Sequence, residues 1–316
     1  MIIKELEIKN YRGIKTLNIP FDQNGAVFYG INGSGKSTVI KAINVLLSQI
    51  IDKVSNGRFK NRISIGEDDV SYGHSLTVLT ATLILNQDQY MVSKAYDKKK
   101  RTSLHVNKTL MEFSNLLRVN LLENPDFELP VFVVYGVNRS VVDIPLRIRK
   151  THSFDRIAAY EKSSAGTDFR VFFEWFRNQE DYENQVRANE DNNYQDKQLQ
   201  TVREAIYRFM PGFSKLKVER KPKLKMVVTK NNTKLSINQL SDGEKCYIAM
   251  IGDLARRMAI ANPDAEDPLK CGGIVLIDEI ELHLHPEWQR IIVPALRKTF
   301  PNIQFIITTH SPQVLG

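Results

Sequence analysis

The stretch Tyr29-Gly30-Ile31-Asn32-Gly33-Ser34-Gly35-Lys36-Ser37-Thr38 decides the fold of this chain. A short apolar run, 26–28, precedes it, and apolar residues at helical spacing follow it. We expect positive φ at Gly30, Gly33 and Gly35, so that backbone N–H groups at the start of the helix can approach a polyphosphate. The sequence therefore predicts a phosphate-binding loop. A merely flexible Gly- and Ser-rich loop would explain neither the Lys-Ser pair nor the helix.

The side chains of this loop suit a nucleoside triphosphate with Mg²⁺. Lys36 is expected to bridge the β- and γ-phosphates, and the Ser37 hydroxyl to bind the metal. The residues expected to contact the nucleotide belong to the loop and the first helical turn: Gly30, Asn32, Gly33, Ser34, Gly35, Lys36, Ser37 and Thr38. Kinases, GTPases and many ATPases share such a loop, so the carboxyl-terminal motifs have to distinguish these classes.

Two adjacent carboxylates follow a second apolar run. Residues 274–277 are all aliphatic, which is typical of a strand buried on both faces, and Asp278 and Glu279 come directly after them. An ionised pair at the end of a buried strand needs a cation or hydrogen bonds. We expect Asp278 to hold Mg²⁺, directly or through water, and Glu279 to orient or deprotonate the attacking water.

Two further motifs lie in the same part of the chain. Ser241, with Glu244 three residues later, forms a capping box at the start of an apolar helix, and capping alone would be the favoured interpretation. His310 ends another buried-type strand, which a predicted helix between Pro286 and Phe300 separates from Asp278. That spacing describes one βα unit, so Asp278 and His310 are expected at the same carboxyl edge of a parallel sheet.

Together these motifs resemble those of ABC-type ATPases in their SMC-, RecF- and overcoming-lysogenization-defect (OLD)-like form. The resemblance implies an α/β P-loop NTPase fold, an ABC-type ATPase head with a mixed or parallel core sheet, an antiparallel β-layer and a short helical lobe. It also implies that Ser241 and Gly243 bind the γ-phosphate held by a second subunit, and that His310 is a switch residue sensing that phosphate. ATP with Mg²⁺ would then close a head-to-head homodimer.

Two more nucleotide contacts are expected from the same resemblance. Arg12 follows a predicted strand over 2–8, as in the SMC and RecF start, and by resemblance approaches the nucleotide; a surface role is the alternative. The family also places a Gln after a strand such as Val131–Tyr135. No Gln stands there in this chain, and we expect Asn138 or Arg139 to substitute for it.

We expect three segments along the chain. Residues 1–136 would form the amino-terminal part of the ATPase lobe, 137–236 a helical insertion, and 237–316 the remaining nucleotide motifs. The alternating runs 76–85 and 90–96 predict a hairpin whose loop is 86–89. Long heptad repeats are absent, so the insertion should be short. Its polar stretch 184–197, with Asp191 and Asp196, is predicted to be a solvated loop.

Composition sets limits on the partners. The net charge of +8 favours nucleic acid as a partner, and basic clusters occur at 98–101, 147–150 and 215–225; solvated turns and an edge strand are an equal alternative. Two Cys residues give no disulfide framework, so a reducing cytoplasm is the default. Neither a signal peptide nor an apolar run long enough for a membrane span is present. His283 and His285 invite a metal site, but the family has its D-loop there.

The segments Tyr135–Arg139, Val142–Pro145 and Asp278–Pro286 resemble the bacterial ATPases of anti-phage systems such as Septu, including retron-associated forms. In that family the ATPase partners an HNH nuclease, and retron-linked members also associate with a reverse transcriptase and its DNA–RNA product. The resemblance implies an ATP hydrolase that regulates a partner nuclease in defence. The alternatives are a RecF- or SMC-like DNA-binding ATPase in DNA repair and the head of an OLD-type nuclease. The Leu-Ser-Asp-Gly-Glu sequence at 240–244 counts against a transporter ATPase.

Overall fold

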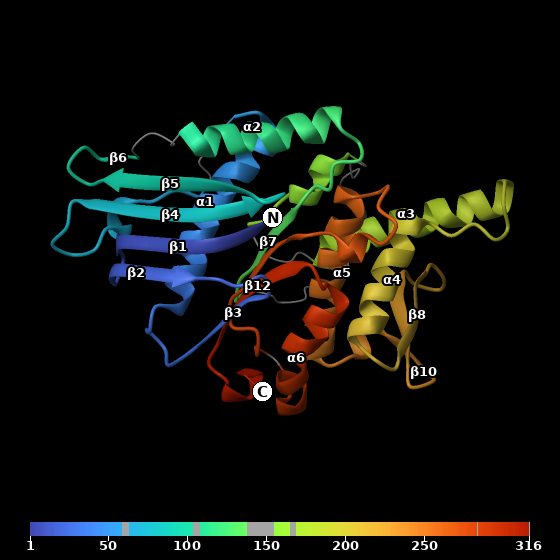
Figure 1. Cartoon of the computed structure of the whole chain (residues 1–316). Helices are drawn as coiled ribbons and strands as arrows, with labels where there is room; N and C mark the ends of the chain where they lie inside the picture. Colours follow the sequence, from blue (N-terminus) through green and yellow to red (C-terminus); the bar gives the residue numbers. More distant parts are fainter. Residues whose placement is uncertain (59–62, 104–107, 138–154, 165–168, 283, 316) are drawn as a thin grey trace.

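A four-stranded parallel sheet lies at the centre of the computed structural model, in the order β3-β12-β11-β7 (Figure 1). Its strands are β3 (Gly25–Tyr29), β7 (Val131–Tyr135), β11 (Gly273–Ile277) and β12 (Ile303–Thr309). Every residue of β7, β11 and β12 is buried, as the apolar runs predict for strands covered on both faces, and in β12 this includes Gln304, Thr308 and Thr309. The structure describes residues 1–58, 63–103, 108–137, 155–164, 169–282 and 284–315.

An antiparallel sheet lies beside the parallel one, in the order β2-β1-β4-β5-β6 (Figure 1). Its strands are β1 (Ile2–Tyr11), β2 (Ile14–Pro20), β4 (Leu76–Leu85), β5 (Asp88–Asp97) and β6 (Thr102–Ser103). Helix α1 (Lys36–Asn56) packs against strands of both sheets, and α2 (Lys108–Glu123) packs on α1 and β5. Because α1 is enclosed in this way, 14 of its 21 residues are buried.

The predicted hairpin is present, but its loop is shorter than expected. Leu85 pairs directly with Asp88, so that only Asn86 and Gln87 form the turn. Both have positive φ, 49° and 75°, which is the geometry of a type I′ turn that matches the twist of the strands. The prediction of a four-residue loop, 86–89, was therefore wrong by two residues.

The remaining elements form a helical and β insertion followed by the carboxyl-terminal part. They are α3 (Phe169–Asn189), α4 (Lys197–Phe209), β8 (Phe213–Glu219), β9 (Lys225–Lys230), β10 (Thr233–Ser236), α5 (Asp242–Ala261) and α6 (Pro286–Thr299). Five 3₁₀ helices complete the described chain: Glu67–Asp69, Arg156–Tyr160, Ile237–Gln239, Pro268–Lys270 and Pro312–Leu315. Within the described ranges, no helix combines the length and the apolar character needed to cross a membrane.

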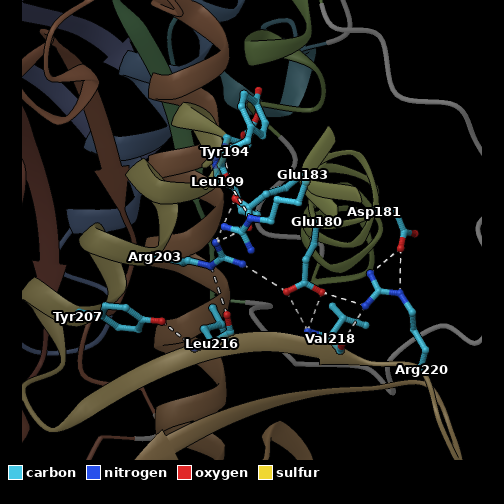
Figure 2. Close-up of polar contacts among 12 residues, drawn as sticks. Glu180, Asp181, Glu183, Tyr194, Leu199, Arg203, Tyr207, Leu216, Val218 and Arg220 are labelled. Carbon is cyan, nitrogen blue, oxygen red and sulfur yellow. Dashed lines mark hydrogen bonds and ion pairs between the residues drawn. The ribbon is translucent and has the colours of Figure 1, made fainter. Parts of the chain in front are cut away.

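A network of ion pairs holds the insertion together (Figure 2). Arg203 on α4 contacts Glu180 at 3.3 Å and Glu183 at 3.2 Å, both on α3. Glu180 also accepts a hydrogen bond from the Val218 N–H of β8 at 3.0 Å and pairs with Arg220 at 3.3 Å. Burial raises the pKa of Glu180 even though Val218, Arg220 and Arg203 lower it. The network therefore joins α3, α4 and β8 through charges that are largely removed from water.

The polar stretch after α3 is not the solvated loop that the sequence predicted. Helix α3 extends to Asn189, and Asp196 is buried at the start of α4, where it accepts a hydrogen bond from the Leu199 N–H at 2.8 Å. The Asp196 N–H in turn donates to Glu183 at 3.0 Å. Asp196 thus caps a helix and joins the network, whereas Asp191 is exposed as expected.

Candidate nucleotide-binding site

A cavity of about 330 Å³ lies at the carboxyl edge of the parallel sheet. The phosphate-binding loop joins the end of β3 to the start of α1 and forms one wall. The residues lining the cavity come from this loop, from the β1–β2 turn and from the ends of β11 and β12: Gly13, Ile14, residues 32–38, Glu279 and His310. Strand, loop and helix are therefore arranged as the motif requires.

Lys36 is buried and holds the loop in shape. Its Nζ donates hydrogen bonds to the carbonyl oxygens of Gly30 at 2.7 Å and Ile31 at 2.9 Å. Gly33 and Gly35 have φ of 79° and 94°, so the expectation of left-handed backbone is confirmed at these two positions. Gly30 does not have positive φ, and that part of the expectation was wrong. Its carbonyl instead serves as an acceptor for Lys36.

Ser37 and Asp278, the two residues expected to hold Mg²⁺, are in contact. Ser37 Oγ donates a hydrogen bond to Asp278 Oδ1 at 3.0 Å, although 241 residues separate them. Thr308 Oγ1 donates to the same carboxylate oxygen at 2.5 Å. A hydroxyl and a carboxylate are the hard oxygen donors that Mg²⁺ prefers, so the residues present fit this metal.

Glu279 and His310 face each other across the end of the sheet. Glu279 Oε1 lies 3.5 Å from His310 Nε2, and His310 Nδ1 lies 3.3 Å from Lys36 Nζ. Glu279 has a φ of 51°, a left-handed conformation that is uncommon for a residue with a Cβ. Such backbone strain is found where a side chain has to be aimed in a particular direction. Here it accompanies a carboxylate that lines the cavity.

Two residues of this site were missed in the sequence. Thr308 is fully buried in β12 and, besides binding Asp278, accepts a hydrogen bond from the Glu279 N–H at 2.8 Å. Glu281 accepts a hydrogen bond from the His310 N–H at 2.5 Å, and its other carboxylate oxygen is buried without a partner in the described part of the chain. The available signal was a hydroxyl inside an apolar strand and a third carboxylate close to Asp278.

Ser241 and Gly243 lie at a different place. They line a second cavity of about 200 Å³ at the start of α5, together with apolar and aromatic side chains that include Tyr247 and Trp288. The predicted capping box is confirmed, because Ser241 Oγ accepts from the Glu244 N–H while Glu244 accepts from the Ser241 N–H at 3.1 Å. Neither Ser241 nor Gly243 lines the cavity of the phosphate-binding loop in the same chain.

The other predicted contacts are less direct. Arg12 pairs with Asp69 at 2.7 Å and does not line the cavity, whereas the next two residues, Gly13 and Ile14, do. Asn138 and Arg139 lie outside the described residues, as do the 147–150 cluster and His283. Among the side chains that the structure describes, no three His, Cys, Asp or Glu residues gather as a metal site.

Part of the basic stretch 215–225 is neutralised within the chain. Arg220 binds Asp181, and Lys225 pairs with Glu219 at 3.4 Å. Lys217, Lys221 and Lys223 are exposed on or next to β8. Strands β8, β9 and β10 form a three-stranded antiparallel sheet in the order β10-β9-β8. The stretch is therefore partly an ion-paired strand of this sheet, and its role in binding nucleic acid stays a prediction.

Residues 26–316 match the family described as "AAA domain, putative AbiEii toxin, Type IV TA system". The protein named "Retron Ec83 probable ATPase" from Escherichia coli is 33% identical over 99% of this chain and 69% of its own length. "Septu protein PtuA" from Bacillus thuringiensis is 25% identical over 100% of this chain and 73% of its own length.

The solved structure of an SMC head bound to the C-winged helix domain of ScpA shares the fold, with a TM-score of 0.57, 17% identity and coverage of 99% of this chain and 91% of that one. At this identity the likeness concerns the fold alone. The match over 26–316 and the identity to the retron protein along nearly the whole chain lead to one conclusion: the chain belongs to this AAA-domain family, in the group of the retron and Septu ATPases, and has the α/β P-loop fold of ABC-type ATPase heads.

Proposed function

We propose that this protein is an Mg²⁺-dependent ATP hydrolase that closes into a head-to-head dimer when ATP binds. The observation that carries the proposal is the convergence of Asp278, Glu279 and His310, from the ends of β11 and β12, on the loop that carries Lys36 and Ser37. A loop that cradles phosphates, an oxygen-donor pair for Mg²⁺ and a carboxylate aimed into the same cavity are the parts that ATP hydrolysis requires.

Each side chain has a distinct task in this proposal. Lys36 exchanges its carbonyl partners for phosphate oxygens, while Ser37 and Asp278 hold Mg²⁺, which would neutralise charge on the phosphates. Glu279 accepts a proton from the attacking water or orients it, since its carboxylate lines the cavity. His310 lies within 3.5 Å of both Glu279 and Lys36 and is suited to sense the γ-phosphate between them.

The separation of the two cavities supports the proposed dimer. Ser241 and Gly243 present a hydroxyl and a helix N-terminus, both of which favour phosphate, yet they lie outside the Lys36 cavity of their own chain. Two copies arranged head to head would bring the Ser241 turn of one chain to the Lys36 loop of the other. We propose that each of the two resulting sites contains residues from both chains.

We further propose that the nucleotide state of this dimer regulates a partner nuclease in anti-phage defence. The support is the similarity to the retron and Septu proteins. The HNH nuclease partner is what the family resemblance described above implies. A reverse transcriptase with its DNA–RNA product is a further candidate partner.

A Glu279→Gln variant tests the proposed function. It keeps the shape and the phosphate-binding residues but removes the carboxylate, so we expect ATP to bind, hydrolysis to stop and a closed dimer to accumulate. Dimer formation would be followed by analytical ultracentrifugation with and without MgATP, and hydrolysis by phosphate release. Hydrolysis at the normal rate would remove Glu279 from the catalytic role, and a monomer at saturating ATP would refute the dimer.

Mixed dimers test whether sites are shared between chains. A chain with Lys36→Ala keeps its Ser241 turn, and a chain with Ser241→Arg keeps its Lys36 loop, so each variant alone should be inactive. Mixing them restores one complete site in each mixed dimer, and a measurable part of the activity should return. If no activity returns while both variants are folded, the sites do not combine residues from two chains.

A second candidate function is that of a DNA-binding ATPase without a nuclease partner, which the exposed lysines next to β8 would favour. ATP hydrolysis stimulated by DNA, with binding that weakens steeply as salt rises, would support this alternative.

A further inference from the structure

An ion pair connects the start of α5 to the small β8–β10 sheet. Lys230, the last residue of β9, places its Nζ 2.6 Å from Glu244 Oε1. Glu244 Oε2 accepts hydrogen bonds from the Ser241 hydroxyl at 2.9 Å and from the Ser241 N–H at 3.1 Å. One carboxylate therefore binds a lysine with one oxygen and the proposed phosphate-binding serine with the other.

The negative charge of Glu244 is a problem for phosphate recognition. A carboxylate bonded to the Ser241 hydroxyl competes with phosphate for the same proton and also repels a triphosphate at short range. Burial would raise the pKa of Glu244, but the ion pair with Lys230 and the hydrogen bonds from Ser241 outweigh it and keep the pKa below its ordinary value. Glu244 is thus ionised at neutral pH, and its charge has to be compensated.

Lys230 is positioned to compensate the charge of Glu244. Its ammonium lies 5.8 Å from the centroid of the Phe213 ring, and it lines the same cavity as Ser241, Gly243 and Glu244. The other acidic residue of the turn, Asp242, pairs with the Lys245 ammonium at 2.7 Å, whereas the contact of Lys245 with Ser241 is a backbone hydrogen bond, from its N–H to the Ser241 carbonyl at 3.0 Å. Lys230 is therefore the cation that acts on the carboxylate in contact with the serine.

We infer that Lys230 is a positioning residue for phosphate recognition across the dimer. By neutralising Glu244, it allows the Ser241 hydroxyl to turn from that carboxylate to the γ-phosphate of a nucleotide held by a second copy of the chain. The inference rests on the proposed function. It also makes the β8–β10 sheet part of the nucleotide response, because the end of β9 sets the charge at the start of α5.

The test compares ATP-driven dimerisation of Lys230 variants with that of their parent protein. All carry Glu279→Gln, so that hydrolysis cannot interfere. Lys230→Met removes the cation and keeps a long side chain, and we expect the dimer to need at least about tenfold more protein or MgATP, which corresponds to about 1.4 kcal/mol. Adding Glu244→Gln removes the uncompensated charge and should restore dimerisation. Lys234→Met is the matched control, since Lys234 lies on β10 of the same sheet and pairs with Glu219 instead.

The outcomes separate the inference from the proposed function. A Glu279→Gln protein that stays monomeric with MgATP contradicts the proposed function itself. If that protein dimerises and Lys230→Met dimerises equally well, or if Glu244→Gln fails to restore it, the inference alone is wrong. Binding of a fluorescent ATP analogue to the Lys36 loop should be unchanged in Lys230→Met. Should that variant fold poorly, Lys230→Arg, which keeps the charge, must dimerise like the parent protein while Lys230→Gln does not.

Discussion

Thr308 is the residue whose replacement most directly tests how the site is assembled. The Thr308→Val substitution keeps the shape of the side chain but removes the hydroxyl that donates to Asp278 at 2.5 Å and accepts from the Glu279 N–H at 2.8 Å. A hydrogen bond to a charged group contributes about 1.5–3 kcal/mol and a neutral one about 1 kcal/mol, and the Glu279 N–H would be left without its partner. We therefore expect a loss of about 2–4 kcal/mol in the free energy of unfolding.

This loss can be measured by thermal unfolding. A chain of 316 residues has an entropy of unfolding of about 0.7 kcal/mol/K, so the expected fall in Tm is about 3–6 °C. Since Asp278 and Glu279 would lose their alignment, ATP hydrolysis should also fall about tenfold or more, while ATP binding changes little. Thr299→Val is the control, because Thr299 is equally buried but bonds only within its own helix.

Thr308→Ser provides the sharpest check, because it restores the hydroxyl without the methyl group. It should recover most of the hydrolysis rate. A Thr308→Val protein with the Tm and the rate of the parent, or a Thr308→Ser protein as slow as the valine variant, would refute the reasoning that Thr308 positions the two carboxylates.

Three other predictions concern the loop and the insertion. Lys36→Ala should abolish ATP binding in calorimetry, and unchanged affinity would contradict the phosphate-loop assignment. Arg203→Met should cost about 2–4 kcal/mol in thermal unfolding, because it leaves two buried carboxylates without this partner, whereas Arg208→Met, at an exposed ion pair, should cost under about 0.5 kcal/mol. Because the pKa of Glu180 is raised in the folded state, its protonation favours folding. This contribution to the free energy of unfolding is complete below the ordinary Glu pKa, about 4.3, and is lost as pH rises through the raised pKa. The Tm of the parent should therefore fall relative to Glu180→Gln as pH rises from about 4 to 7, and a constant difference would contradict the shift.

Much of the fold follows from local patterns in the sequence. The apolar run of β7, the aliphatic run of β11 and the largely apolar run of β12 mark strands buried on both faces, and such strands are parallel and central. Because parallel strands present their carboxyl ends at one edge, Asp278 and His310 were expected together, and both reach the phosphate-binding loop: Asp278 contacts Ser37, and His310 contacts Lys36. The division of the chain at 136 and 236 stays a prediction.

The roles of Thr308 and Asp196 could not be predicted, because they depend on strand register and on burial, which local sequence patterns do not encode. Thr308 reaches Asp278 only because Ile277 pairs with Ile307 across the sheet, and nothing around Thr308 in the sequence specifies that register. Asp196 resembles any Asp in a polar run until α3 and α4 pack and remove it from water. Residues that position others are therefore harder to recognise than those that contact the ligand.

The hydrogen bonds between Lys36 and its own loop affect how a nucleotide binds. The Lys36 ammonium already donates hydrogen bonds to two carbonyl oxygens. When a triphosphate binds, phosphate oxygens therefore replace carbonyl oxygens as its acceptors. The net gain then comes mainly from the phosphate charge, so monophosphates and uncharged analogues should compete poorly for the same space. The hydrogen bonds of Lys36 within its own loop thus favour highly charged ligands.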